Sequence, residues 1–199
     1  MKFVIATHNA HKLEEIRAIF NTNGLEVCSA LDFPDVPDTI EDRDTLEGNA
    51  IKKAQELCAA TGLMALADDS GLEVEALNGA PGVFSARYAG EPCSYEDNNA
   101  KLLRELSGKD NRRARFRTVI ALVRPGEEPL TVEGICPGTL IDELRGEHGF
   151  GYDPLFIPDG YTQTFAELPS EMKNKISHRA NALAEASNVW GEIFHSLEK

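Results

Sequence analysis

The sequence predicts an α/β protein whose β-sheet contains both parallel and antiparallel strands. Near the start, the unbroken apolar segment 2–7 predicts a buried strand, and a polar loop leads from it into a helix predicted over 12–21. Further along, the turn at 126–129 joins a strand predicted over 114–123 to another at 130–136, which indicates an antiparallel hairpin. Parallel units at the start and a hairpin later together predict a mixed sheet.

The other predicted elements follow from hydrophobic periodicity and from capping residues. Thr45 caps a helix predicted over 46–60, and Thr61-Gly62 ends it. Further strands are predicted at 25–30, 63–67, 72–77 and 155–157, an amphipathic helix at 95–106, and a short helix after Pro169-Ser170. The last helix shows an apolar stripe formed by Leu183, Ala186, Val189, Trp190, Ile193 and Leu197. We expect Trp190 to serve packing.

Length and composition indicate one globular protein with an acidic surface. The 199 residues, 42% hydrophobic and 27% charged, fit one sizeable domain or two closely packed lobes over 1–199 better than two independent domains. The net charge of −13 argues against nucleic-acid and membrane partners, so any site for a polyanion must be built locally. The four cysteines form no C-x-x-C pair and no run is long enough to span a bilayer, which predicts reduced thiols and a cytoplasmic protein.

The segment 63–90 carries the strongest chemical signal. Its apolar run 63–67 leads directly into Asp68 and Asp69, and Ser70 and Gly71 follow. Paired carboxylates at the end of a buried strand suit a hard cation such as Mg²⁺. The same four residues also favour a turn between two strands, and the local sequence leaves both interpretations open.

Two other regions could hold an anion. Residues 7–12, T-H-N-A-H-K, lie between a strand and a helix N-terminus, where backbone N–H groups favour a phosphate, although P-loop glycines are lacking. In the second helix Lys52 and Lys53 point about 100° apart, so we expect one to face a site and the other to be solvated. Four arginines at 112–117 alternate along a predicted strand, and half of them should form its solvent face.

The loop 150–154, F-G-Y-D-P, combines glycine with aromatic residues. Glycine permits close backbone approach, and an aromatic face can stack on a planar base. A turn anchored by two aromatic side chains explains the same residues. Up to this point the fragments suit a nucleoside polyphosphate and a magnesium ion.

Six segments taken together resemble the inosine/xanthosine triphosphate pyrophosphatases. The segments are T-H-N-A-H-K (7–12), T-L-E-G-N-A-I-K-K-A (45–54), A-D-D-S-G-L-x-V (67–74), G-A-P-G-V-F-S-A-R-Y-A-G (79–90), G-F-G-Y-D-P-L-F (149–156) and I-S-H-R (176–179). They follow the family's order over nearly the whole chain. The resemblance implies a long twisted mixed sheet flanked by helices, two lobes around a central nucleotide-binding cleft, and a homodimer.

The resemblance also implies roles for individual residues. Asp69 would position or deprotonate the attacking water with support from Asp68, and Lys53 would reach the phosphates. Glu41 and Asp69 would bind Mg²⁺. The implied substrate-binding residues are Thr7, His8, Asn9, Ala10, His11, Lys12, Ser70, Phe150, Gly151, Tyr152, Asp153, Lys173, His178 and Arg179. Among these, Phe150 would stack on the base, and Lys173, His178 and Arg179 would contact its 6-keto edge.

The implied reaction is Mg²⁺-dependent hydrolysis of dITP, ITP and XTP to a nucleoside monophosphate and pyrophosphate, which keeps these nucleotides out of DNA and RNA. Two departures from the family pattern stand out. His8 replaces a glycine, and Gly48 stands where a glutamate usually precedes Asn-Ala, which leaves any metal role for Glu47 in doubt.

Three alternatives remain at this point. A pyrophosphatase of the septum-inhibitor type would be expected to lack the F-G-Y-D and S-H-R segments. A nucleotide sensor without catalysis would not need the acids Glu41, Asp68 and Asp69. In a purely structural protein the polar loops would have no role.

Overall fold

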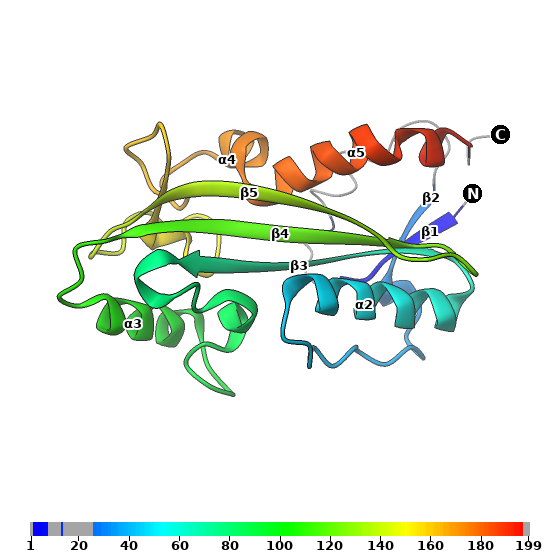
Figure 1. The fold of residues 1–199 in the computed structure, drawn as a ribbon, viewed down its shortest axis with the longest axis horizontal. Coiled ribbons are helices and arrows are strands. Elements are labelled where there is room, and N and C mark those ends of the chain that lie inside the picture. Colours follow the sequence, from blue (N-terminus) through cyan, green and yellow to red (C-terminus); the bar gives the residue numbers. More distant parts are fainter. Residues whose placement is uncertain (1, 8–12, 14–25, 197–199) are drawn as a thin grey trace. The chain divides into compact units, whose positions relative to one another are not determined.

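The structure is a computed structural model that describes residues 2–7, 13 and 26–196 (Figure 1). The chain divides into two compact units. The first comprises Met1–Asp69, Thr118–Gly134 and Ala182–Lys199, and the second comprises Ser70–Arg117 and Ile135–Asn181. The expected single two-lobed domain and its central cleft stay predictions.

The elements alternate along the chain as an α/β protein requires. The strands are β1 (Lys2–Ile5), β2 (Glu26–Ser29), β3 (Met64–Val74), β4 (Arg113–Val123), β5 (Leu130–Leu140) and β6 (Phe156–Pro158). The α-helices whose full length lies within the described residues are α2 (Leu46–Thr61), α3 (Tyr95–Leu106), α4 (Ser170–Ile176) and α5 (His178–Ser196). Short 3₁₀ helices are η1 (Ala30–Asp32), η2 (Glu75–Leu77), η3 (Gly82–Arg87) and η4 (Asp153–Leu155). The helix predicted over 12–21 lies outside the described residues, except for the buried Leu13.

The sheet is mixed, as the sequence predicted. Its strand order is β2-β1-β3-β4-β5-β6, with β1 parallel to both of its neighbours and β5 antiparallel to β6. β4 and β5 are adjacent and are joined by the short connection 124–129. Because a parallel crossover needs about a dozen residues or more, this connection makes them an antiparallel hairpin.

In the first unit, α2 and α5 cover opposite faces of the sheet (Figure 1). Phe3, Ile5 and Leu66 alternate along their strands and form one core with Leu183 and Trp190 of α5. Trp190 is 2% exposed, which confirms its packing role. Val189 is 55% exposed, so it does not belong to the buried part of the predicted core or interface stripe.

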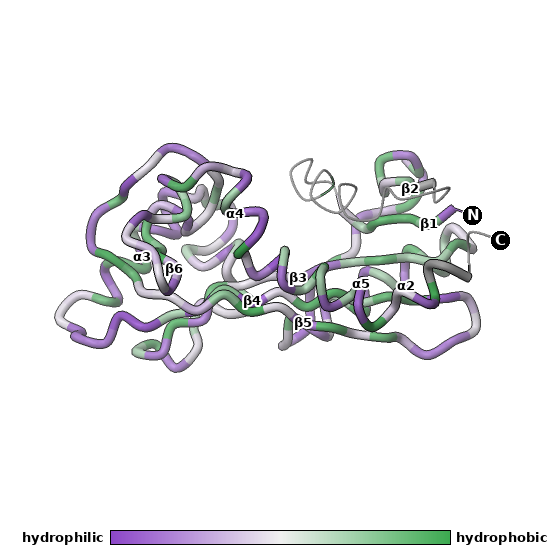
Figure 2. The backbone as a smooth tube through the Cα atoms, turned by 90° about the horizontal axis from the view of Figure 1, so that it is seen from above, coloured by the Kyte–Doolittle hydropathy of each residue, from purple (hydrophilic) through white to green (hydrophobic). Residues whose placement is uncertain are grey.

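A second core lies in the second unit. Leu72 of β3, Phe116 of β4 and Leu102 of α3 belong to it, and the Phe116 ring meets the Phe156 ring edge-on with centroids 4.7 Å apart. Hydrophobic residues concentrate along the strands and hydrophilic ones in the connections (Figure 2). Among the described residues, none of the helices has the length and apolar character needed to cross a bilayer.

β3 decides between the two interpretations of Asp68-Asp69-Ser70-Gly71, because it runs through these residues without interruption. The turn interpretation was therefore wrong. The Leu72 N–H donates to Ser85 Oγ at 2.9 Å, and this hydroxyl donates to the Gly82 carbonyl at 2.6 Å. A Cβ at Gly71 would lie 2.2 Å from that carbonyl oxygen, so glycine permits the close approach. Residues 75–77 form η2 and do not continue the strand.

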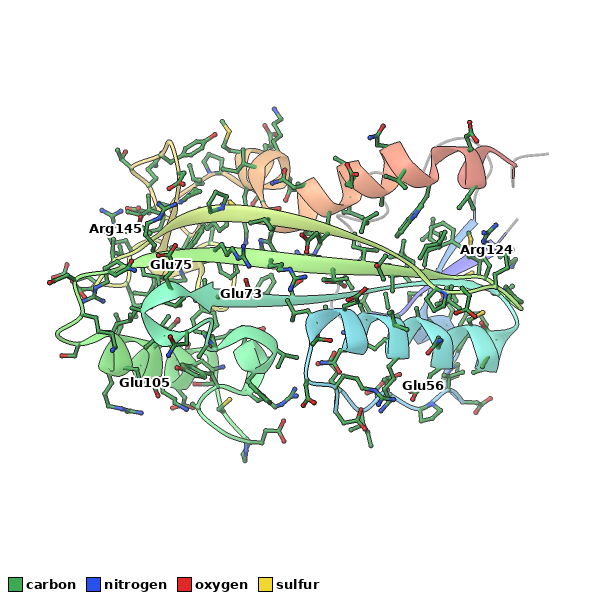
Figure 3. The ribbon with its side chains drawn as sticks, viewed as in Figure 1. Glu56, Glu73, Glu75, Glu105, Arg124 and Arg145 are labelled. Carbon is green, nitrogen blue, oxygen red and sulfur yellow. The ribbon has the colours of Figure 1, made fainter. Side chains whose placement is uncertain are left out.

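The arginine-rich run at 112–117 is neutralised by nearby carboxylates. Arg115 Nε lies 2.6 Å from Glu73, which projects from β3 (Figure 3), and Arg113 makes two bonds of 2.7 and 2.8 Å to Asp159. Arg112 lies 2.7 Å from Asp142. This run therefore provides surface ion pairs.

Candidate functional site

The helix α2 presents the central cation of the site. The Thr45 hydroxyl caps it by accepting from the Gly48 N–H at 3.0 Å, and Gly62 ends it in the left-handed conformation, as predicted. Ala50, Ala54 and Leu57 are buried. Asn49 and Lys53, four residues apart, therefore lie on one side of the helix.

Lys53 lies between two carboxylates. Its Nζ is 2.6 Å from Glu41 Oε1 and 3.5 Å from Asp69 Oδ1, and its side chain is 12% exposed. Burial alone lowers the pKa of Lys53, but the charges of Asp69, Asp68 and Glu41 outweigh burial and hold this pKa above its ordinary value. Lys53 is therefore a charged ammonium within a group of acids.

The same carboxylates could hold a divalent cation. Glu41 and Asp69 both direct an oxygen at the Lys53 ammonium, which shows that their oxygens can surround one cation. Carboxylate oxygens are the ligands that Mg²⁺ prefers, with waters and substrate phosphates completing its shell. Within the described residues, no group of three or more His, Cys, Asp or Glu side chains is placed to hold a metal. Two carboxylates that converge on one ammonium fit a Mg²⁺ ion whose remaining ligands are waters or phosphate oxygens.

Asp68 and Asp69 are both buried, 2% and 7% exposed. Since side chains alternate along a continuous strand, they point to opposite faces of β3. Asp69 is joined to α2 through Asn49 and Lys53. Asp68 acts on Lys53 through its charge.

The structure describes the predicted phosphate-binding segment 7–12 only at its first residue. Thr7 is 7% exposed and follows β1, and the preceding Ala6 N–H bonds to the Leu66 carbonyl at 2.8 Å. Thr7 therefore lies at the carboxyl end of β1, where ligands of parallel sheets bind. The predicted phosphate ligands His8, Asn9, Ala10, His11 and Lys12 lie outside the described residues.

Of the two adjacent lysines, Lys53 faces the site, and the prediction that the other one, Lys52, is solvated was wrong. Lys52 Nζ donates to the Ile40 carbonyl and to Asp42 Oδ1, both at 2.8 Å, and its side chain is 16% exposed. The loop that carries Glu41 passes over α2, and Lys52 binds that loop. Glu47 accepts a bond from Thr131 at 3.2 Å on the surface, away from the Lys53 group.

In the second unit, Phe150, Asp153 and Lys173 lie together. The buried Asp153 carboxylate accepts from the Phe150 N–H at 2.9 Å and from Lys173 Nζ. Lys173 Nζ also lies 5.2 Å from the centre of the Phe150 ring. Gly149 has φ +76° and approaches the Asp153 carboxylate so closely that a Cβ would clash with it. The Asp153 carboxylate therefore fixes the conformation of the segment 149–153 to which it belongs.

Tyr152 and His178 are fixed by neighbours in the second unit. The Tyr152 hydroxyl donates to the Ser85 carbonyl at 2.9 Å, and burial raises the pKa of this phenol. The His178 ring stacks on Phe116 with centroids 4.8 Å apart. His178 and Arg179 begin α5 and are 7% and 3% exposed.

Three residues near these groups were not predicted. Asn49 bonds to Asp69, Asn99 donates to the Gly151 carbonyl at 3.0 Å, and Tyr95 lies 6.1 Å from the Phe150 ring. An asparagine on the buried side of a helix, four residues before a site lysine, is a signal that could have revealed Asn49.

Comparisons with known proteins agree with the fold. The model of the Ham1 family matches residues 3–189. A dITP/XTP pyrophosphatase from Desulforamulus reducens is 51% identical over 98% of both chains, and one from Geobacter sulfurreducens is 52% identical over 92% of this chain and 93% of its own. The solved structure of a HAM1 protein from Coxiella burnetii is 41% identical, covers 96% of this chain and 99% of its own, and superposes with a TM-score of 0.91. The match runs over nearly the whole chain, and we conclude that the chain belongs to the Ham1 family.

Proposed function

We propose that this protein hydrolyses the deaminated purine nucleotides dITP, ITP and XTP to nucleoside monophosphate and pyrophosphate. The observation that carries the proposal is the buried Lys53 ammonium between Glu41 and Asp69, in a chain about half identical to dITP/XTP pyrophosphatases. Cations and carboxylates gathered in this way suit phosphoryl transfer, in which charge neutralisation is the main task.

In this proposal Lys53 binds the phosphates and neutralises part of their charge, together with Thr7, His8, Asn9 and Lys12. Glu41 and Asp69 hold Mg²⁺, which when bound supplies further positive charge at the phosphate oxygens. The carboxylate of Asp69 orients a water and takes up its proton. The water oxygen bonds to the α-phosphorus, the bond from this phosphorus to the bridging oxygen breaks, and pyrophosphate leaves.

The second unit supplies the residues for base selection. Phe150 stacks on the purine, and Lys173, His178 and Arg179 donate to its 6-keto oxygen. Adenine presents an NH₂ donor at this position, and such a mismatch can cost about 10⁴-fold in kcat/KM. The Asp153 carboxylate holds both Phe150 and Lys173 in place, which supports a fixed recognition site.

Product analysis with Mg²⁺ tests the reaction. We expect dITP to give monophosphate and pyrophosphate, with little turnover of dATP, dGTP or dTTP. Orthophosphate release would refute attack at the α-phosphorus, and rapid dTTP hydrolysis would favour a pyrophosphatase of the septum-inhibitor type. Nucleotide binding without turnover would favour a sensor.

The Asp69→Asn variant tests the assigned base. It is expected to stay folded and to lose at least about 100-fold in kcat, since general-base catalysis contributes about 10²–10⁴-fold. Full activity would refute the assignment. We further propose a homodimer, which sedimentation equilibrium would detect as twice the chain mass of 21.8 kDa.

A further inference from the structure

We propose that Asn49 is a positioning residue that fixes Asp69 relative to the segment 39–43, which carries Glu41 and is called the Glu41 loop below. The inference rests on the proposed function only in so far as Glu41 and Asp69 hold the metal. It assigns a task to a buried amide that the sequence motifs left without one.

The amide of Asn49 is fully buried and uses both of its ends. Its Nδ2 donates to Asp69 Oδ2 at 3.1 Å, and its Oδ1 accepts the backbone N–H of Arg43 at 3.0 Å. A single planar group therefore joins the catalytic strand to the loop that carries Glu41. The Asn49 amide is planar, and α2 is capped at both ends. A movement of Asp69 that shifts the amide would therefore also disturb the bond to the Arg43 N–H, and a movement of Arg43 would disturb the bond to Asp69.

The Asn49 bond also selects the rotation of the Asp69 carboxylate. The terminal torsion of an aspartate has a broad energy profile, so the side chain by itself does not choose an orientation. Here Oδ2 faces Asn49 while Oδ1 faces Lys53 at 3.5 Å. The two bonds hold the carboxylate with Oδ1 toward the cation.

The Glu41 loop is held on both sides of Glu41. Lys52 binds the carbonyl of Ile40, the residue before it, and Asn49 binds the N–H of Arg43, two residues after it. Further out, the Thr39 hydroxyl donates to Glu56 at 2.6 Å. Asn49, Lys52 and Glu56 are spaced i, i+3 and i+7, so they lie on one side of α2 and together bind the loop from Thr39 to Arg43.

A matched control exists on the helix α3. Asn98 is also buried, 3% exposed, and its amide also joins its helix to a neighbouring segment at both ends. Its Oδ1 accepts from the Ala89 N–H at 2.7 Å, and its Nδ2 donates to the Ala86 carbonyl at 3.1 Å. None of these bonds involves a carboxylate of the site, so Asn98→Ala reproduces the structural loss alone.

The experiment compares Asn49→Ala and Asn98→Ala in the full chain. The readouts are kcat and KM for dITP at saturating Mg²⁺, the melting temperature, and Mn²⁺ binding without nucleotide by electron paramagnetic resonance. Mn²⁺ suits the same oxygen ligands as Mg²⁺. For Asn49→Ala we expect about 10- to 100-fold losses in kcat and in Mn²⁺ affinity, typical for residues that orient metal ligands, with a smaller change in KM. Asn98→Ala should lower the melting temperature while kcat and Mn²⁺ affinity stay within about twofold.

A third variant, Asn49→Asp, separates the two bonds. It keeps an acceptor for the Arg43 N–H but places a second carboxylate beside Asp69, so kcat should fall as in Asn49→Ala although the loop contact persists. Unchanged kcat in this variant, or Mn²⁺ affinity in Asn49→Ala equal to that of Asn98→Ala, would overturn the inference. If the wild-type protein binds Mn²⁺ but does not hydrolyse dITP, the proposed function fails while the Mn²⁺ comparison still decides the role of Asn49. Absence of Mn²⁺ binding by the wild type would overturn the inference directly.

Discussion

Replacing Gly71 with alanine tests the close approach that keeps β3 continuous beside the acidic pair. The added Cβ would lie 2.2 Å from the Gly82 carbonyl oxygen and 3.1 Å from Ser85 Oγ. Normal contacts between heavy atoms are about 3.5 Å, so the backbone of Gly82 must move by roughly 1 Å. Overpacking of this kind costs about 1–3 kcal/mol of unfolding free energy. For a chain of this length that corresponds to a fall in melting temperature of about 2 to 12 °C.

Activity should fall more than stability suggests. Asp69 and Ser70 directly precede Gly71, and a misplacement of about 1 Å in a catalytic group can cost about 100-fold in rate. Gly191→Ala is the matched control, because the same methyl group on α5 meets no atom within 4 Å and should stabilise the helix by about 0.5–1 kcal/mol. Urea unfolding and dITP turnover measure both variants. A Gly71→Ala protein with wild-type stability and kcat would refute the reasoning.

Three further changes give distinct expectations. Lys53→Met removes the cation between Glu41 and Asp69 and should cost at least about 100-fold in kcat/KM. Lys52→Met loses one of the contacts that hold the loop carrying Glu41, so it should destabilise by under about 1 kcal/mol and lower kcat/KM less than Lys53→Met does; equal activity losses would contradict this division. Trp190→Ala should cost about 3–5 kcal/mol in urea unfolding, and its exposed neighbour Val189→Ala less than about 0.5 kcal/mol. Burial, with help from the charge of Asp159, raises the pKa of the Cys136 thiol from 9.0 to about 12, so this thiol should resist Ellman's reagent at pH 8 until the protein unfolds. The contribution of the buried neutral Cys136 thiol to the free energy of unfolding is present below pH 9 and is lost as the pH rises toward 12. Rapid labelling of Cys136 in the native protein would contradict its burial.

Local signals predicted α2 and α3 well. The Thr45 cap and the Gly62 terminator fix α2 within one residue of its predicted end, and α3 has the predicted bounds. These signals act within a few residues of the chain, where capping bonds and periodicity decide the structure. The parallel start of the sheet and its later hairpin followed from patterns of the same range.

Contacts between distant segments could not be predicted in this way. The composition of D-D-S-G favours a turn, but Gly82 and Ser85 pack against Gly71 and Leu72 and extend the strand. Helix geometry correctly predicted that Lys52 and Lys53 point in different directions and that only one of them faces the site. It could not show that a loop returns over α2 and binds Lys52. In both places a partner distant in sequence outweighed local preference.

The continuity of β3 also supports the choice of Asp69 as the proposed base. In a turn, Asp68 and Asp69 could have faced the same ligand, and the sequence would not distinguish them. In a strand they point to opposite faces, and the Asp69 carboxylate is joined by hydrogen bonds to Asn49 and Lys53 of α2. The negative charge of Asp68 helps keep Lys53 protonated. The choice between turn and strand and the proposed base are therefore connected, because the extended backbone that rules out the turn also places the two carboxylates on opposite faces.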